Sequence, residues 1–274
     1  MENYQEYELF EMFNKIKRKY GEQKVLDLYE DKILKLKNAK LSYIISVVCK
    51  KAKVKKHEKI ILECKNPEYS YKFVSNIEGA DIKAHEEVIF NSENLNFIYL
   101  FVLHIKGADV KKAEEIILNS NSAEYCTLFA LNIEGVDVGE LEQVVLERKI
   151  ACYCYMFAKG VENADIKAHE QIVIESKNPE YCYLFAKDIE DADIEALQEV
   201  VIRSKNPKYC YLFALNVKGA DIERLRKIVM KKDKGYKELF IENIDNKSEK
   251  IKEEELKQES ASDSIKRLNK MLKR

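Results

Sequence analysis

Hydrophobic and polar positions along most of this chain follow a pattern that repeats every 28 residues. Six consecutive blocks, residues 66–233, follow one another without an insertion. We number the places within a block from its first residue, so that place 1 of the first block is Asn66. Place 8 is a phenylalanine in every block: Phe73, Phe101, Phe129, Phe157, Phe185 and Phe213. Self-similarity at a fixed period indicates a repeat architecture.

Each block contains two helical patterns. An asparagine followed by a proline, as in Asn178-Pro179, predicts the start of the first helix, because asparagine caps a helix and proline fits its first turn. A glycine at place 14 predicts its end, and an aspartate at place 16 predicts the N-cap of the second helix. By their helical spacing, the residues expected to be buried in the fifth block are Tyr181, Cys182, Phe185, Ala186, Ile189, Ile194, Leu197, Val200 and Val201.

These patterns predict an all-α fold. Helices of roughly 12 and 10 residues are too short to be stable alone in water, so neighbouring blocks must supply the missing burial. The consensus NPxYCYLFAxxIxGADIxxLxxVVIxS resembles the α-solenoids, the class that holds HEAT, armadillo, tetratricopeptide and Sel1-like repeats. The resemblance implies a curved superhelix that binds partners along an extended surface. It carries over no functional residues, because the period is shorter than the roughly 34 to 47 residues of those families.

The repeat divides the chain into three parts. Residues 1–37 are expected to form degenerate N-terminal helices, and residues 38–245 a solenoid, which gives about eight helix hairpins. Residues 246–274 are expected to form a charged spacer and a short basic amphipathic helix, whose apolar face is Ile265, Leu268, Met271 and Leu272. This helix has three open roles: it covers the last block, docks on a second copy of the chain in self-association, or contacts a partner. The oligomeric state does not follow from the sequence.

The outer side of the first helices is the candidate binding surface. Place 10 faces away from the predicted core and carries several leucines, and contiguous apolar surface indicates a binding site. Tyrosines at place 6 flank the buried stripe, where they can pack against the next block, line a groove, or do both. We expect the first helices to line the concave surface and to bind another protein. The predicted contact residues are Tyr71, Tyr99, Leu103, Leu131, Tyr155, Lys159, Tyr183, Lys187, Tyr211 and Leu215.

Charge adds a second hypothesis. The net charge is −1, but residues 31–65 contain eleven lysines against three acids, and residues 134–199 contain sixteen acids against six bases. The basic patch is Lys50, Lys51, Lys53, Lys55 and Lys56. With the tyrosines as stacking platforms, these lysines favour the alternative of an RNA or single-stranded DNA binder. The lysine- and isoleucine-rich composition favours a bacterial or phage origin, where a protein that inhibits a defence effector is one form of the protein-binding hypothesis.

The sequence offers little for catalysis. We expect no enzyme activity, cofactor or metal, since phosphate-binding and nucleophile motifs are missing from the sequence. The seven cysteines are expected to be free thiols, mostly in the core. His57, His85 and His169 share place 20, and the first two form either a metal or catalytic pair or polar substitutions on a partly buried face. The N-terminus lacks a signal-peptide pattern and no apolar run is long enough for a membrane helix, so we expect a cytoplasmic protein.

Overall fold

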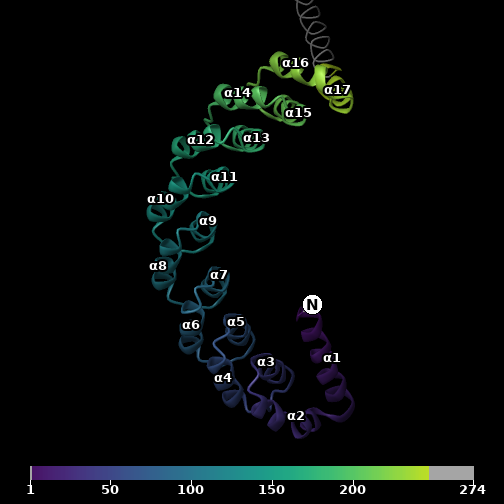
Figure 1. Ribbon diagram of the computed structural model, residues 1–274, viewed down its shortest axis with the longest axis vertical. Coiled ribbons are helices and arrows are strands. Elements are labelled where there is room, and N and C mark those ends of the chain that lie inside the picture. The colour runs from purple at the N-terminus through teal and green to yellow at the C-terminus, as the bar shows by residue number, and fades with distance from the viewer. Residues whose placement is uncertain (1, 247–274) are drawn as a thin grey trace, which may run out of the picture. The chain divides into compact units, whose positions relative to one another are not determined.

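The chain is an all-α helical-repeat solenoid, as predicted. The computed structural model describes residues 2–246, with side chains from residue 7 onward, and this part contains 17 α-helices and no strand (Figure 1). The predicted C-terminal amphipathic helix therefore lies outside the described residues. None of the helices in the described part combines the length and the apolar character that crossing a membrane demands.

Each of the six blocks forms one helix pair, and residues 38–65 before them form a seventh. The first helices are α3 Ala39–Val48, α5 Pro67–Asn76, α7 Leu95–His104, α9 Ala123–Asn132, α11 Ala151–Gly160, α13 Pro179–Asp188 and α15 Pro207–Asn216. The second helices are α4 Val54–Glu63, α6 Ile82–Phe90, α8 Val110–Ser120, α10 Val138–Arg148, α12 Ile166–Glu175, α14 Ile194–Ser204 and α16 Ile222–Lys232. Before and after these pairs come α1 Glu2–Tyr20, α2 Glu22–Leu36, α17 Lys234–Phe240 and the π-helical turn η1 Ile241–Asp245.

The helix starts agree with the predicted caps. The Asn66 side chain accepts a hydrogen bond from the Tyr69 backbone N–H, which satisfies a free donor in the first turn of α5. The Asp81 carboxylate does the same for the Ala84 N–H of α6. This second cap recurs one period apart at Asp109, Asp137, Asp165, Asp193 and Asp221.

The helix ends differ from the prediction. Helix α5 stops at Asn76, and Gly79 lies in the turn after it with φ 74°, so the glycine shapes the connection and does not terminate the helix. In two blocks Asn163 and Asp191 stand at place 14 instead of glycine, and they adopt the same left-handed conformation. A second left-handed residue follows six of the second helices, α4 to α14, whereas Asp233 after α16 is extended with φ −142°. The residue types gave no sign of this conformation, which is adopted by Lys65, Glu93, Asn121, Lys149, Lys177 and Lys205.

The core consists of two columns of fully buried side chains. All six place-8 phenylalanines have 0% exposure. A matching column on the second helices is equally buried and consists of Ile61, Ile89, Ile117, Val145, Val173, Val201 and Val229. In the fifth block, Cys182, Phe185, Ala186, Leu197 and Val201 are buried as predicted, whereas Tyr181, Ile189, Ile194 and Val200 are half-buried.

The cysteines are free thiols, and most are core residues, as expected. Cys49, Cys126, Cys154, Cys182 and Cys210 are buried, Cys152 is half-buried, and Cys64 is exposed. Desolvation raises the pKa of the Cys126 and Cys182 thiols to about 12. Thiols with so high a pKa are almost fully protonated near neutral pH and are poor nucleophiles.

Two compact units make up the chain, the first ending at Arg148 and the second beginning at Lys149. In the first unit, α1, α3, α5, α7 and α9 form a first-helix row, and α2, α4, α6, α8 and α10 form a second-helix row. In the second unit, the first-helix row consists of α11, α13, α15 and α17, and the second-helix row consists of α12, α14 and α16 (Figure 1). Within each unit, neighbouring first helices contact one another more closely than neighbouring second helices do, so the first helices occupy the more tightly spaced row.

Candidate binding surfaces

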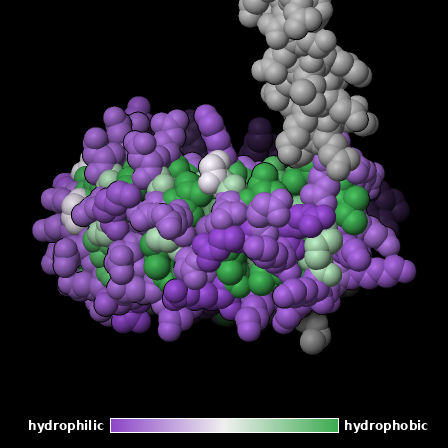
Figure 2. Space-filling view, turned by 90° about the horizontal axis from the view of Figure 1, so that it is seen from above, coloured by the Kyte–Doolittle hydropathy of each residue, from purple (hydrophilic) through white to green (hydrophobic). Residues whose placement is uncertain are grey.

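The first-helix row exposes apolar side chains at two adjacent places. Leu103 is 37% exposed and Leu215 is 38% exposed, while Leu131 is half-buried. Place 7 lies one helical turn earlier and contributes a second series, namely Leu100, Leu128, Met156, Leu184 and Leu212. Figure 2, which is seen from above the view of Figure 1, shows hydrophobic residues in patches among mostly hydrophilic ones.

Lys159 and Lys187, the predicted lysines of place 10, both lie beside Asp188. The Lys159 ammonium donates hydrogen bonds to Asp188 at 2.7 Å and to the Tyr155 hydroxyl at 3.0 Å. The hydrogen bond with Asp188, followed by that with Tyr155, raises the pKa of Lys159. The Lys187 Nζ is 3.6 Å from the same carboxylate. These two lysines and one aspartate form a polar cluster in the second unit, and its net positive charge is partly neutralised.

The place-6 tyrosines connect consecutive first helices. The Tyr155 hydroxyl donates to Asp188 at 2.5 Å, and Asn216 donates to the Tyr183 hydroxyl at 3.0 Å. Both partners are at place 11 of the next first helix. The Tyr183 ring also lies against the Tyr209 ring, with centroids 6.5 Å apart. The same ring contact recurs at Tyr71–Phe97, Tyr99–Tyr125, Tyr155–Tyr181 and Tyr211–Tyr236.

This packing limits what the tyrosines can offer a ligand. Tyr183 and Tyr211 are each only 8% exposed, and Tyr71, Tyr99 and Tyr155 are half-buried. The rings pack against the next block, which is one of the two roles indicated by the sequence, and the groove role stays a prediction. The hydroxyls are hydrogen-bonded at four of the five positions, with Tyr71 facing the exposed His104 ring at 2.8 Å.

The basic patch is only partly free. Lys53 pairs with Glu30 and Asp31 at 3.2 and 3.0 Å, and Lys55 pairs with Glu58 at 2.8 Å. Lys50, Lys51 and Lys56 are exposed, and no carboxylate of the described residues forms an ion pair with their side chains. Three ammonium groups therefore remain available to an anionic partner.

The histidines are more deeply placed than the sequence indicated. His57, His85 and His169 have 0% exposure, which corrects the expectation of a partly buried face. The His85 ring stacks on Phe73 with centroids 5.3 Å apart. Two of the rings lie near a glutamate of the preceding second helix: His57 Nε2 is 3.5 Å from Glu30 and His85 Nε2 is 3.7 Å from Glu58. Among residues 7–246 no group of three or more His, Cys, Asp or Glu side chains is arranged to hold a metal ion.

The glutamate at place 21 has a role that the sequence pattern was not expected to show. Glu58 is buried and accepts the Asp81 backbone N–H at 2.6 Å, so it joins one second helix to the start of the next. The same bond spans 23 residues at Glu30–Lys53, Glu86–Asp109, Glu114–Asp137, Glu170–Asp193 and Gln198–Asp221. The signal was present, because glutamates at residues 30, 58, 86, 114, 142 and 170 keep the 28-residue period.

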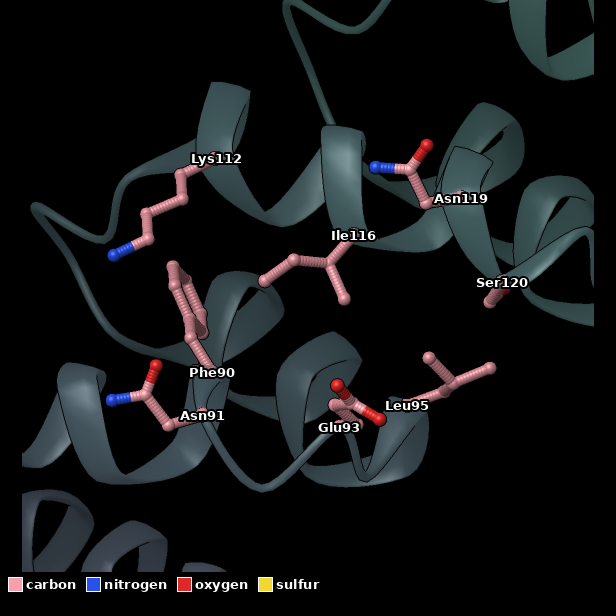
Figure 3. Close-up of a pocket in the computed structure, with 8 residues that line it drawn as sticks. All are labelled: Phe90, Asn91, Glu93, Leu95, Lys112, Ile116, Asn119 and Ser120. Carbon is pink, nitrogen blue, oxygen red and sulfur yellow. The ribbon is translucent and has the colours of Figure 1, made fainter.

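A further feature lies on the second-helix row of the first unit. A recess of about 550 Å³ opens between α6 and α8. Figure 3 shows the side chains of Phe90 and Ile116 approaching each other inside it, with Leu95 nearby. Its remaining lining residues are polar: Asn91, Glu93, Lys112, Asn119 and Ser120.

Comparisons with known proteins give no relative for this chain. No protein-family model, no curated protein and no solved structure matches it. The surfaces described above are therefore the basis for any statement about function.

Proposed function

We propose that the chain is a non-catalytic helical-repeat scaffold that binds another protein through its first-helix row. The observation that carries the proposal is the apolar series at places 7 and 10. On α7 and α9 these places bring together Leu100, Leu103, Leu128 and Leu131, none of which is fully buried. A contiguous apolar surface of this kind is characteristic of interaction sites.

The first-helix row of the second unit combines exposed apolar and charged side chains of its own. In the second unit, Leu215 and Met156 are each 38% exposed, and the cluster of Lys159, Lys187 and Asp188 offers both signs of charge. Apolar anchors within a polar border are the usual composition of a protein-protein interface. The tyrosines support this surface by fixing the spacing of the helices that carry it.

Binding of RNA or single-stranded DNA is the alternative. The free ammonium groups of Lys50, Lys51 and Lys56 favour it, since phosphates would pair with them. The tyrosines favour it less than the sequence indicated, because bases need open ring faces and these rings pack on the next helix. The bacterial or phage origin and the role as an inhibitor stay predictions from composition.

The experiment is an affinity capture from lysate of the source cells, with and without nuclease, using wild-type protein and the Leu103→Glu/Leu131→Glu variant. We expect one stoichiometric protein to be retained after nuclease and at least about a tenfold loss of it with the variant. A charge buried at an apolar contact costs more than 1.4 kcal/mol, which corresponds to a factor of ten.

The matched control is Leu28→Glu on α2, because Leu28 is 37% exposed like Leu103 but lies on the second-helix row. It should retain the partner, and both variants should keep wild-type helicity by circular dichroism. Equal capture by wild type and a folded Leu103→Glu/Leu131→Glu variant would reject this surface. Loss of the captured protein on nuclease treatment, or with rising salt, would favour the nucleic-acid alternative.

A further inference from the structure

Two connections of the first unit lie against each other at its N-terminal end. Residues 17–24 run from the end of α1 into the start of α2, and residues 48–51 run from the end of α3 toward α4. The Lys51 backbone N–H donates a hydrogen bond to the Glu22 carboxylate at 2.5 Å. The Lys17 ammonium donates another, at 2.6 Å, to a backbone carbonyl of the second segment. We call these two segments together the N-terminal corner.

The N-terminal corner is strongly basic. It contains six cationic side chains and a single carboxylate, that of Glu22. Glu22 is half-buried and already accepts the Lys51 N–H, and the Lys17 ammonium lies 4.0 Å from it. The other five cations are exposed and form no ion pair with a carboxylate of residues 7–246: Arg18, Lys19, Lys24, Lys50 and Lys51. A cluster of this density attracts polyanions.

Tyr20 adds an open aromatic ring to these charges. Its side chain is 59% exposed. The Lys19 Nζ lies 5.0 Å from the centre of the ring, and no other ring of residues 7–246 packs on it. The place-6 tyrosines differ, because their rings pack on the next first helix. The Tyr20 ring is therefore accessible to a nucleic-acid base, which binds proteins by stacking on such rings.

The composition of the corner favours a single-stranded nucleic acid over a lipid surface. A basic surface that binds membranes also inserts apolar side chains at the boundary of the acyl chains. The single aliphatic side chain of the corner is Val48, which is only 3% exposed. A single strand offers phosphates to the cations and unpaired bases to the Tyr20 ring. In a duplex the base faces are stacked on one another, so this ring would have no partner.

Acidic side chains limit the path of the strand. A recess of about 720 Å³ along α1 is lined by Arg18 and Lys19, but also by Glu8 and Glu11. Those two carboxylates would repel phosphates. The favourable path therefore leads from the end of α1 across the corner and not along α1.

We propose that the N-terminal corner binds single-stranded nucleic acid without sequence preference. The five exposed cations contact phosphates, and one base stacks on Tyr20. This site gives the nucleic-acid alternative the open ring that the place-6 tyrosines lack. It uses none of the leucines on α7 and α9 that carry the proposed function, so either proposal can fail without the other.

The test is a fluorescence-anisotropy titration of two labelled strands with the full chain at low salt. One strand is a twelve-nucleotide oligothymidylate, and the other is an abasic strand with the same number of phosphates. We expect saturable binding of the oligothymidylate with a Kd below about 100 µM. The abasic strand should bind at least about fivefold more weakly, because it has no base to stack.

Substitutions of Tyr20 separate stacking from charge. Tyr20→Ala should weaken the oligothymidylate at least about fivefold and leave the abasic strand unchanged, whereas Tyr20→Phe should keep wild-type affinity for both. The matched control is Tyr7→Ala, because Tyr7 is 65% exposed but lies beside Glu8 at the other end of α1. It should bind both strands like the wild type. Circular dichroism verifies that each variant keeps its helicity.

A salt series tests the phosphate contacts. Lys50→Ala/Lys51→Ala should reduce the slope of log K against log salt by about 1.4, since each phosphate contact with a single strand contributes about 0.7. The control Lys106→Ala/Lys218→Ala removes the same charge from exposed lysines at place 13 of two other blocks and should keep the slope.

Four outcomes would overturn the proposal. They are no saturable binding up to about 1 mM protein at low salt, equal affinity for the two strands, and a loss with Tyr7→Ala as large as with Tyr20→Ala. The fourth is displacement of the strand by phosphatidylserine–phosphatidylcholine vesicles as efficiently as by unlabelled oligothymidylate at equal phosphate. That result would assign the corner to a lipid surface.

Discussion

At the scale of single residues, the place-21 glutamate stabilises the contact between blocks. Glu86, for example, accepts the Asp109 N–H at 2.7 Å and pairs with Lys83 at 2.8 Å. Gln198 replaces this glutamate in the block where Glu195 stands at the place of the lysine. The substitution keeps the acceptor oxygen and avoids two like charges one turn apart. The essential property at place 21 is therefore an acceptor, and the negative charge is secondary.

This role predicts different effects for two substitutions of Glu86. Glu86→Gln should change the free energy of unfolding by less than about 1 kcal/mol, because the amide oxygen still accepts the Asp109 N–H. Glu86→Ala leaves a backbone N–H without a partner and should cost about 1–3 kcal/mol. Urea denaturation measures both. The exposed neighbour Glu87 is the control as Glu87→Ala, and equal losses for both Glu86 variants would contradict the role.

The buried histidines predict an acid-sensitive fold. Desolvation lowers the pKa of His57 and His85 below the ordinary value of 6.5, although Glu30 near His57, and Glu58 and Asp81 near His85, oppose it. The positive charges of Lys53 near His57 and of Lys55 near His85 lower these pKa values further. Since the unfolded chain takes up these protons first, stability is retained above about pH 6.5 and falls as the pH drops below it. The loss is at most about 1.4 kcal/mol per histidine per pH unit.

Urea denaturation at pH 7.5 and pH 5.5 tests this dependence. The wild type should be less stable at pH 5.5, and the His57→Leu/His85→Leu variant should lose less over the same interval. Leucine is suitable because it occupies place 20 in other blocks, as at Leu141 and Leu197, where it is fully buried. An identical pH dependence of variant and wild type would mean that other groups cause the loss.

At the scale of the elements, a helix pair depends for its stability on the neighbouring pairs that pack against it. First helices of ten residues gain little from intrinsic propensity. Their stability comes from one wholly buried phenylalanine each and, in most blocks, from side-chain caps at the helix starts, although α11 begins after Ile150 without such a cap. In α11, this residue is Phe157, which lies 5.1 Å from the His169 ring of α12.

Truncation of this phenylalanine should therefore have a large effect. Phe157→Ala should lower the free energy of unfolding by about 3–5 kcal/mol, as for other buried phenylalanines. Met156→Ala, at the adjacent and 38% exposed position, should cost less than about 1 kcal/mol. Thermal or urea denaturation of the two variants measures the difference. Similar losses would show that the buried column does not dominate the stability of the pair.

At the scale of the whole molecule, every block contacts mainly its neighbours in the sequence. Stability in such an array is a sum of local terms, so a defect need not spread along the chain. This holds within each of the two compact units.

Hydrogen exchange measured by mass spectrometry can test this locality. Phe101→Ala in the first unit should speed exchange in α5 to α9, because the cavity weakens α7 and the helices that pack on it. Exchange in α13 to α16 should change by less than about twofold. A uniform increase over both units would indicate a single cooperative transition and contradict local stability.

The sequence alone determined the period, the helix pair and the identity of the core. Phe73 and its five equivalents, and aspartates such as Asp81, could be assigned because a buried face and an N-cap each require particular residue types at fixed spacing. The apolar place 10 also followed from helix geometry. These features are local, and 28-residue repetition made each visible six times.

Only the tertiary structure decided which polar residues join blocks and which remain free. Glu58 and Lys56 lie two residues apart in α4, yet one is buried against the Asp81 N–H and the other is exposed. Tyr183 has a residue type that is common at interfaces, but the next first helix covers it. The recesses between second helices likewise depend on how far apart packed helices lie. Such distances arise from contacts between residues 23 to 33 apart, which the local pattern does not encode.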